Sequence, residues 1–143
     1  MLDSGQYGVL ATAGDDGRPY GVPLSYLYKD GAVYFHCASE GRKIDNLRGN
    51  NAATFTVVGA TRPVYDKSFS TYYQSVIVSG TVREMTGDAD KYRILYALAE
   101  KYLPGHMDKA DDAIRKALAR TAVYVLEPES VTGKAKRPQP VQS

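Results

Sequence analysis

Short runs in which apolar and polar residues alternate make up most of the first half of the chain, and clusters of Gly, Asp, Asn and Lys separate them. An alternation with a period of two turns one face of a strand toward a core and the other toward solvent. It predicts strands over residues 7–13, 20–28, 32–37, 52–58, 75–85 and 121–126. The sequence therefore predicts a mainly β protein, an antiparallel sheet or barrel of about six strands.

Helical spacing interrupts this pattern in a few segments. A short helix is predicted over residues 39–49, with Ser39 as its N-cap. The longest helix runs from Asp88 to about Pro104, because apolar residues recur there at i, i+3, i+4 and i+7. A third helical segment covers residues 112–119. We therefore expect short helices packed on a β framework.

The chain of 143 residues has the length of one domain. We expect this domain to cover residues 1–133, followed by a flexible C-terminal tail at 134–143 that contains two prolines. Pro23 lies inside the second predicted strand and has no N–H group to donate. That strand is therefore predicted to lie at a sheet edge or to carry a bulge, which leaves backbone groups free for a ligand.

Composition narrows the class of protein. Hydrophobic residues at 43% and charged residues at 24% are ordinary for a folded domain. No apolar run reaches the length of about 18 residues that a membrane helix needs, and no signal peptide is evident, so we expect a cytoplasmic protein that binds no membrane. Cys37 is the single cysteine, which agrees with a reducing compartment. The net charge of +2 is too small to indicate nucleic acid, and the basic residues at 134–137 are interpreted as part of a solvated tail.

The most informative segment is 33–47, VYFHCASEGRKIDNL, in which a strand leads into a helix whose first turn holds Gly41, Arg42 and Lys43. Free N–H groups and the positive end of the helix dipole attract an anion at such a position, glycine permits close approach, and the cations add charge. The segment predicts a phosphate site. Taken alone it is a weak signal, because basic residues on an exposed helix face are often only solvated.

The order and spacing of several segments resemble the FMN-binding split barrels related to pyridoxamine 5'-phosphate oxidase, particularly the nitroimidazole-resistance (Nim) branch. The segments are GVLATAGDDGRPYGVPLSY at 8–26, VYFHCASEGRKIDNLRGNN at 33–51, FTVVG at 55–59, FSTYYQSVIVSG at 69–80, KYLP at 101–104 and SVTGKAKRP at 130–138. They span nearly the whole chain. The resemblance implies a split-barrel fold and FMN bound between two identical subunits.

The resemblance also implies which residues hold the cofactor. In the family, basic residues at the start of the helix after the third strand bind the FMN phosphate, and the flavin ring lies along the second strand and the end of the third. A glutamine in the long strand falls at Gln74 or Ser75. The implied cofactor-binding residues are Pro23, Leu24, Ser25, Tyr26, His36, Cys37, Arg42, Lys43, Gln74 and Ser75.

Individual side chains allow more than one interpretation. His36 is the candidate catalytic acid, since its unperturbed pKa is near 6.5, and the alternative is a histidine packed beside the ring. Cys37 is interpreted as a small buried residue. No metal site is legible, although either His36 or His106 could ligate haem, which some split barrels bind. Tyr72 and Tyr73 are expected to line a pocket.

The leading hypothesis is an FMN-dependent oxidoreductase that acts on a small molecule, with a nicotinamide donor and a nitroimidazole or other nitroaromatic as the acceptor. The second is a non-catalytic split barrel that holds flavin, deazaflavin or haem, and the third is a dimeric interaction domain without cofactor. Gly21 replaces the arginine with which pyridoxamine phosphate oxidases begin this strand, which argues against vitamin synthesis. The short segment before the first strand indicates a truncated start or a reduced N-terminal helix.

Overall fold

The computed structural model describes residues 1–65 and 67–138. The strands are β1 (Gly8–Ala13), β2 (Pro19–Leu24), β3 (Leu27–Lys29), β4 (Ala32–Ala38), β5 (Ala52–Val58), β6 (Arg62–Tyr65), β7 (Phe69–Glu84) and β8 (Thr121–Lys136). The helices are α1 (Arg42–Gly49), α2 (Asp88–Tyr102) and α3 (Ala110–Ala117), with 3-10 turns η1 (Pro104–Lys109) and η2 (Leu118–Arg120). The predicted mainly β split-barrel class is confirmed, with more strands than the sequence pattern indicated.

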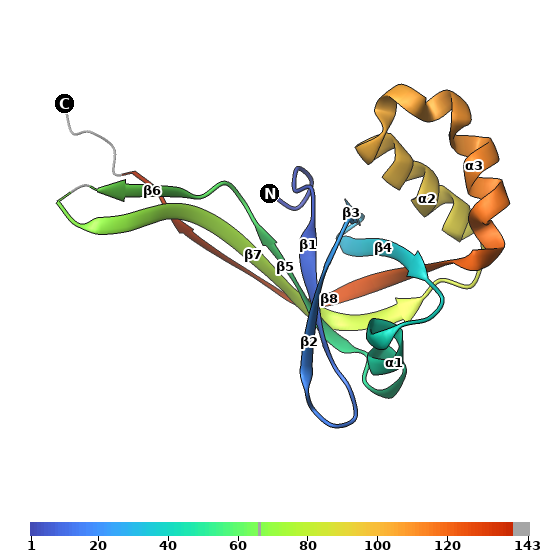
Figure 1. Cartoon of the computed structure of the whole chain (residues 1–143), viewed down its shortest axis with the longest axis horizontal. Helices are drawn as coiled ribbons and strands as arrows, with labels where there is room; N and C mark the ends of the chain where they lie inside the picture. The colour runs from blue at the N-terminus through green and yellow to red at the C-terminus, as the bar shows by residue number, and fades with distance from the viewer. Residues whose placement is uncertain (66, 139–143) are drawn as a thin grey trace.

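One strongly twisted antiparallel sheet organises the chain (Figure 1). Its strand order is β2-β1-β5-β7-β8-β4-β3, and β6 pairs with β7 beside this path. Within the chain β2 is an edge strand, which confirms the position predicted from Pro23. Helix α1 lies near one end of the sheet, and α2 and α3 form a separate layer on the other side of β4 (Figure 1).

Two apolar clusters hold these layers together. The larger cluster lies inside the curved sheet and includes the fully buried Leu10, Phe35 and Phe55, closed at one end by Ile44 of α1. The smaller cluster packs α2 and α3 against β8, with the fully buried Val123 at its centre. Because residues of β4 alternate between the two clusters, this strand forms the wall between them.

The predicted strand over 20–28 is divided in two. Strand β2 ends at Leu24, and β3 begins only at Leu27. The Tyr102 hydroxyl at the end of α2 accepts a hydrogen bond from the Tyr26 N–H at 2.9 Å, and Lys101 Nζ donates one to the Tyr26 carbonyl at 2.9 Å. The backbone of Tyr26 is therefore satisfied by α2 side chains in place of a neighbouring strand, which alternation along the sequence could not reveal.

The long strands β7 and β8 extend beyond the body as an arm, to which β6 adds a third strand (Figure 1). The pairing continues to Tyr73 opposite Lys136, so the first three residues of the predicted tail, 134–136, belong to β8. The boundary predicted at residue 134 is therefore wrong, because ladder hydrogen bonds to β7 hold these residues in the sheet. Residues 139–143 of that tail lie outside the described residues.

One position in the pairing of β7 with β8 requires glycine. A register shift falls between Ser79 and Gly80, where β7 passes β8. A Cβ atom at Gly80 would overlap the backbone carbonyl of Glu127. The close approach of the two backbones therefore depends on glycine at this position.

Candidate functional site

The start of α1 is open and lacks a side-chain cap. Gly41 is the N-cap residue and has φ 129°, a region that favours glycine. Its carbonyl accepts the N–H groups of Ile44 at 2.9 Å and Asp45 at 3.0 Å. Ser39 therefore does not cap the helix as predicted, because the helix begins later in the chain. The N–H groups of Arg42 and Lys43 are left for solvent or an anion.

Positive charge gathers at this helix start, as predicted. Arg42 and Lys43 are its first residues, and the Arg42 guanidinium lies 4.8 Å from the centre of the Tyr20 ring. In residues 1–65 and 67–138 no carboxylate lies within 4.0 Å of either cation, whereas Asp45 pairs with Arg48 at 3.7 Å. Cations at a helix N-terminus are unfavourable unless an anion offsets them. The local charge fits a phosphate group.

The segment Pro23–Tyr26, which is expected along the flavin ring, contains both exposed and buried residues. Pro23 and Ser25 are exposed and Leu24 is half-buried, so their edge is open to a ligand. Tyr26 is fully buried, its ring packs against Phe55 at 4.9 Å, and its hydroxyl donates to the Leu2 carbonyl at 2.6 Å. Burial, with smaller contributions from Tyr102 and Asp3, raises the pKa of Tyr26 to about 12. The Tyr26 side chain therefore anchors the segment Pro23–Tyr26 in the core.

His36 and Cys37 lie on opposite faces of β4. His36 faces the layer of α2 and α3, where it lines a pocket with Ser25. Partial burial of its ring lowers the pKa of His36, although the residue as a whole keeps contact with solvent. Cys37 packs against the core inside the sheet; burial raises the pKa of its thiol, and the nearby charge of Lys43 opposes that shift. Cys37 thus lies on the face of β4 near α1, and His36 lies on the face toward α2 and α3.

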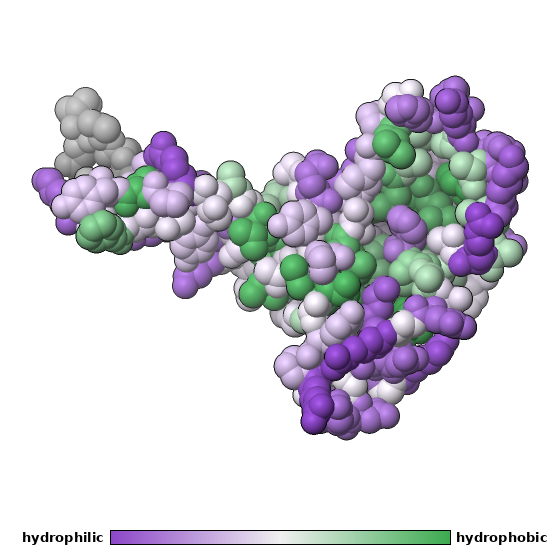
Figure 2. Space-filling view, viewed as in Figure 1, coloured by the Kyte–Doolittle hydropathy of each residue, from purple (hydrophilic) through white to green (hydrophobic). Residues whose placement is uncertain are grey.

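The pocket that contains His36 has a volume of about 480 Å³. We call it the α2/α3 pocket. It is lined by Ser25, His36, Leu95, Leu98, Ala99, Tyr102, Leu103, Ala113, Ile114, Ala117 and Thr121. Figure 2 shows hydrophobic residues framed by hydrophilic ones in the region where α2 and α3 lie. The apolar spacing of α2 predicts one apolar face, and that face forms a wall of this pocket.

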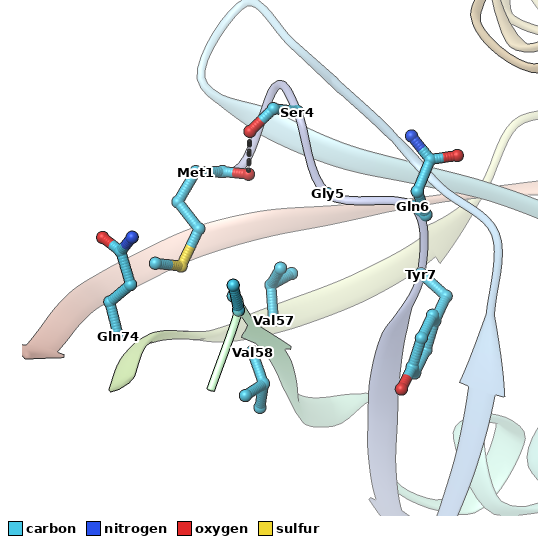
Figure 3. Close-up of a pocket in the computed structure, with 10 residues that line it drawn as sticks. Met1, Ser4, Gly5, Gln6, Tyr7, Val57, Val58 and Gln74 are labelled. Atoms are coloured by element: carbon cyan, nitrogen blue, oxygen red, sulfur yellow. Dashed lines mark hydrogen bonds between the residues drawn. The ribbon is translucent and has the colours of Figure 1, made fainter. Parts of the chain in front are cut away.

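Gln74 and Ser75 lie elsewhere. Gln74 lines a different pocket, of about 470 Å³, between the N-terminal segment and the end of β5, and Figure 3 shows its side chain opposite that of Met1. Both residues belong to the part of β7 that leads into the arm, well away from α1 (Figure 1). One chain therefore does not bring Gln74 together with Arg42 and Lys43.

The remaining candidates are dispersed. Tyr72 lines a pocket of about 490 Å³ on the arm with Lys136 and Arg137, and the Arg62 guanidinium lies 5.5 Å from the centre of the Tyr72 ring. His106 is exposed in η1, outside the lining of the α2/α3 pocket. Within residues 1–65 and 67–138 no group of three His, Cys, Asp or Glu side chains is placed to hold a metal ion. None of the helices described is both long and apolar enough to cross a membrane.

A comparison with known families tests the resemblance that the sequence indicated. The family model described as pyridoxamine 5'-phosphate oxidase matches residues 1–135, nearly the whole chain. The chain belongs to this family. No curated protein matches its sequence.

Solved structures with the same fold have names that refer to different functions and cofactors. A candidate 5-nitroimidazole antibiotic resistance protein from Bacteroides thetaiotaomicron has a TM-score of 0.78 at 23% identity, over 90% of this chain and 76% of that one. The flavocytochrome Anf3 from Azotobacter vinelandii has a TM-score of 0.84 at 22% identity, over 99% and 67%. An FAD- and haem-binding protein from Mycobacterium smegmatis has a TM-score of 0.82 at 22% identity, over 99% and 71%. These similarities support the family fold of this chain.

The spacing of the sequence did not predict the contacts that Lys101 and Tyr102 make at the end of α2. Lys101 and Tyr102 hold the break between β2 and β3, with the Lys101 Nζ 4.0 Å from the centre of the Tyr26 ring. Tyr102 also donates to the Gln6 carbonyl at 2.7 Å. The segment KYLP is one of those that carry the family resemblance, but nothing in its spacing indicated that it holds the backbone of Tyr26, the residue after Ser25.

Proposed function

We propose that this protein is an FMN-dependent oxidoreductase that acts on a small molecule. The observation that carries the proposal is the start of α1, where an uncapped helix, an open glycine and two cations without a carboxylate partner among the described residues come together. A Cβ atom at Gly41 would meet nothing within 4 Å, so space for a bound group adjoins the backbone. This donor set suits a phosphate monoester such as that of FMN.

In this proposal the chain supplies binding and orientation. Backbone N–H groups after Gly41, together with Arg42 and Lys43, hold the phosphate, and the exposed edge of Pro23 and Ser25 lies against the ring. When bound, FMN supplies hydride chemistry between a nicotinamide donor and a small acceptor. His36 contacts the acceptor and donates a proton from an imidazole nitrogen. A nitroimidazole is the first acceptor to test, because one relative of the same fold is named for resistance to that class.

We further propose a two-fold homodimer in the cytoplasm. Support comes from the separation of Gln74 from Arg42 in one chain, since a second copy could bring its Gln74 to the other site. Large apolar side chains on the arm are also exposed, with Phe69 at 95% and Tyr65 at 73%. Sedimentation at micromolar concentration should give a dimer, and a stable monomer with flavin still bound would contradict this arrangement.

The function is tested with the purified protein. We expect FMN absorbance that a nicotinamide donor bleaches without oxygen, and that a 5-nitroimidazole then restores. Bound flavin that no donor bleaches would favour a storage or sensing role instead. A haem band would favour a haem-binding role, with His36 of the α2/α3 pocket as the first ligand to test, and a colourless protein that ignores added FMN would favour an interaction domain.

A further inference from the structure

The α2/α3 pocket has the size and the lining of a binding site for a small molecule. Its volume of about 480 Å³ falls within the range of roughly 300 to 1,000 Å³ typical of ligand sites. Most of its wall is aliphatic and comes from α2 and α3, as in Leu95, Leu98 and Ile114. The pocket is therefore suited to an apolar body.

The pocket carries no full charge. Among the described residues that line it none is Asp, Glu, Lys or Arg. A charged ligand would lose hydration there without gaining an ionic partner, and such a loss is costly. The occupant should therefore be uncharged.

Only a few polar groups face this space, and two of them are uncommitted. The Thr121 hydroxyl donates to the Ala117 carbonyl at 2.9 Å, and Tyr102 is held by Gln6 and Tyr26. In residues 1–65 and 67–138 the side chains of Ser25 and His36 make no hydrogen bond. These two side chains are available to a ligand.

We propose that the α2/α3 pocket holds the electron acceptor, and that this acceptor is an uncharged, mostly apolar molecule whose polar group hydrogen-bonds to His36 or Ser25. The inference rests on the proposed function, because Ser25 belongs both to this pocket and to the edge proposed for the flavin ring. The acceptor would gain two electrons and two protons. The nicotinamide donor supplies the hydride through FMN, and His36 donates the second proton and regains it from solvent.

A matched pair of ligands tests the lack of charge. The amide 2-naphthamide and the carboxylate 2-naphthoate share ring and shape but differ in charge. We would measure their binding by calorimetry to the FMN-saturated, oxidised protein without a reductant, so that no turnover occurs. We expect 2-naphthamide to bind at least about tenfold more tightly, since burying an unpaired carboxylate costs more than about 1.4 kcal/mol.

A matched pair of variants tests the location. Ala113 lines the pocket but is exposed, so Ala113→Phe should fold and obstruct the opening. Ala119 is exposed and outside the lining, and Ala119→Phe is the control. We expect Ala113→Phe to weaken 2-naphthamide binding by about tenfold or more and Ala119→Phe to leave it within about twofold. FMN affinity should be unchanged in both variants.

The outcomes separate the two proposals. Equal affinity for amide and carboxylate, or equal binding by the two variants, would overturn the pocket assignment while FMN remains bound. A protein that binds 2-naphthamide here but does not bind FMN would overturn the proposed function and, with it, the role of the pocket as an acceptor site.

Discussion

The start of α1 and the α2/α3 pocket are two open regions with opposite chemistry. The first has free N–H groups, an open glycine and the cations Arg42 and Lys43. The second is walled by aliphatic side chains, and its free polar groups are Ser25 and His36 among the described residues. One region suits an anion and the other an uncharged molecule.

The difference between these regions traces to the alternation of β4. Cys37 faces the core near Lys43, and His36, one residue earlier, faces α2 and α3. A single strand therefore presents neighbouring residues to two environments. A cofactor anchored by its phosphate at one region and a substrate held in the other would meet near this strand and the Pro23–Ser25 edge.

The largest effect is expected from Arg42→Ala combined with Lys43→Ala. Each charge-assisted hydrogen bond is worth roughly 1.5 to 3 kcal/mol, so FMN affinity should fall by on the order of a hundredfold or more. Titration with FMN and with riboflavin, which lacks the phosphate, measures the effect. The preference for FMN should collapse through loss of FMN affinity alone.

Arg48→Ala is the matched control for this experiment. Arg48 is an exposed cation in the last turn of the same helix and pairs with Asp45 at 3.7 Å. Surface ion pairs contribute about 0 to 1 kcal/mol, so this variant should keep both its fold and its FMN preference. If the double variant also keeps the preference, the phosphate binds elsewhere.

The second prediction concerns the segment between the two regions. Tyr102→Phe removes the hydroxyl that accepts the Tyr26 N–H, and leaves that partly buried donor unpaired. We expect a loss of about 1 to 3 kcal/mol in the free energy of unfolding, measured with denaturant. Tyr92→Phe removes a hydroxyl bonded to Asp111 at an exposed site and should cost within about 0.5 kcal/mol. Equal losses would show that Tyr102 has no special supporting role.

Much of the fold could be predicted because its strands alternate regularly. In β2 the residues Val22 and Leu24 are half-buried, while Gly21 and Pro23 are exposed, which is the alternation that a period of two predicts. Part of the arm was missed because its β8 segment is exposed on both faces. Residues 131–136 are all exposed, so no alternation of burial marks them as a strand.

Only the part of the candidate site that is local in sequence could be predicted. Gly41, Arg42 and Lys43 are adjacent in sequence, so local rules placed them at a helix start. The α2/α3 pocket joins β4 to helices far along the chain, and the apolar spacing of α2 is the same for a core face and a pocket wall. Periodicity along one element cannot distinguish a filled interior from a hollow one.

The third prediction is that His36→Ala keeps FMN but slows its reoxidation by an acceptor. His36 lies in the pocket wall, away from the helix that would hold the phosphate. A positioned acid typically contributes 100-fold or more, but His36 retains solvent contact and water can replace it, so we expect about tenfold. Single-turnover reoxidation measures this rate. An unchanged rate would return His36 to a packing role.

The smallest effect is the pH dependence that His36 gives to stability. Burial lowers its pKa in the folded chain, while the unfolded chain keeps a value near 6.5. As the pH falls from above 6.5 toward the lower folded value, the unfolded chain binds more protons than the folded one, so stability decreases across that window. Denaturant unfolding at several pH values should show a small decrease that is absent in His36→Gln, and NMR titration of the ring should give a midpoint below 6.5. A midpoint at or above the unperturbed value would mean that solvent or a negative charge, rather than the apolar helices, sets the environment of the ring.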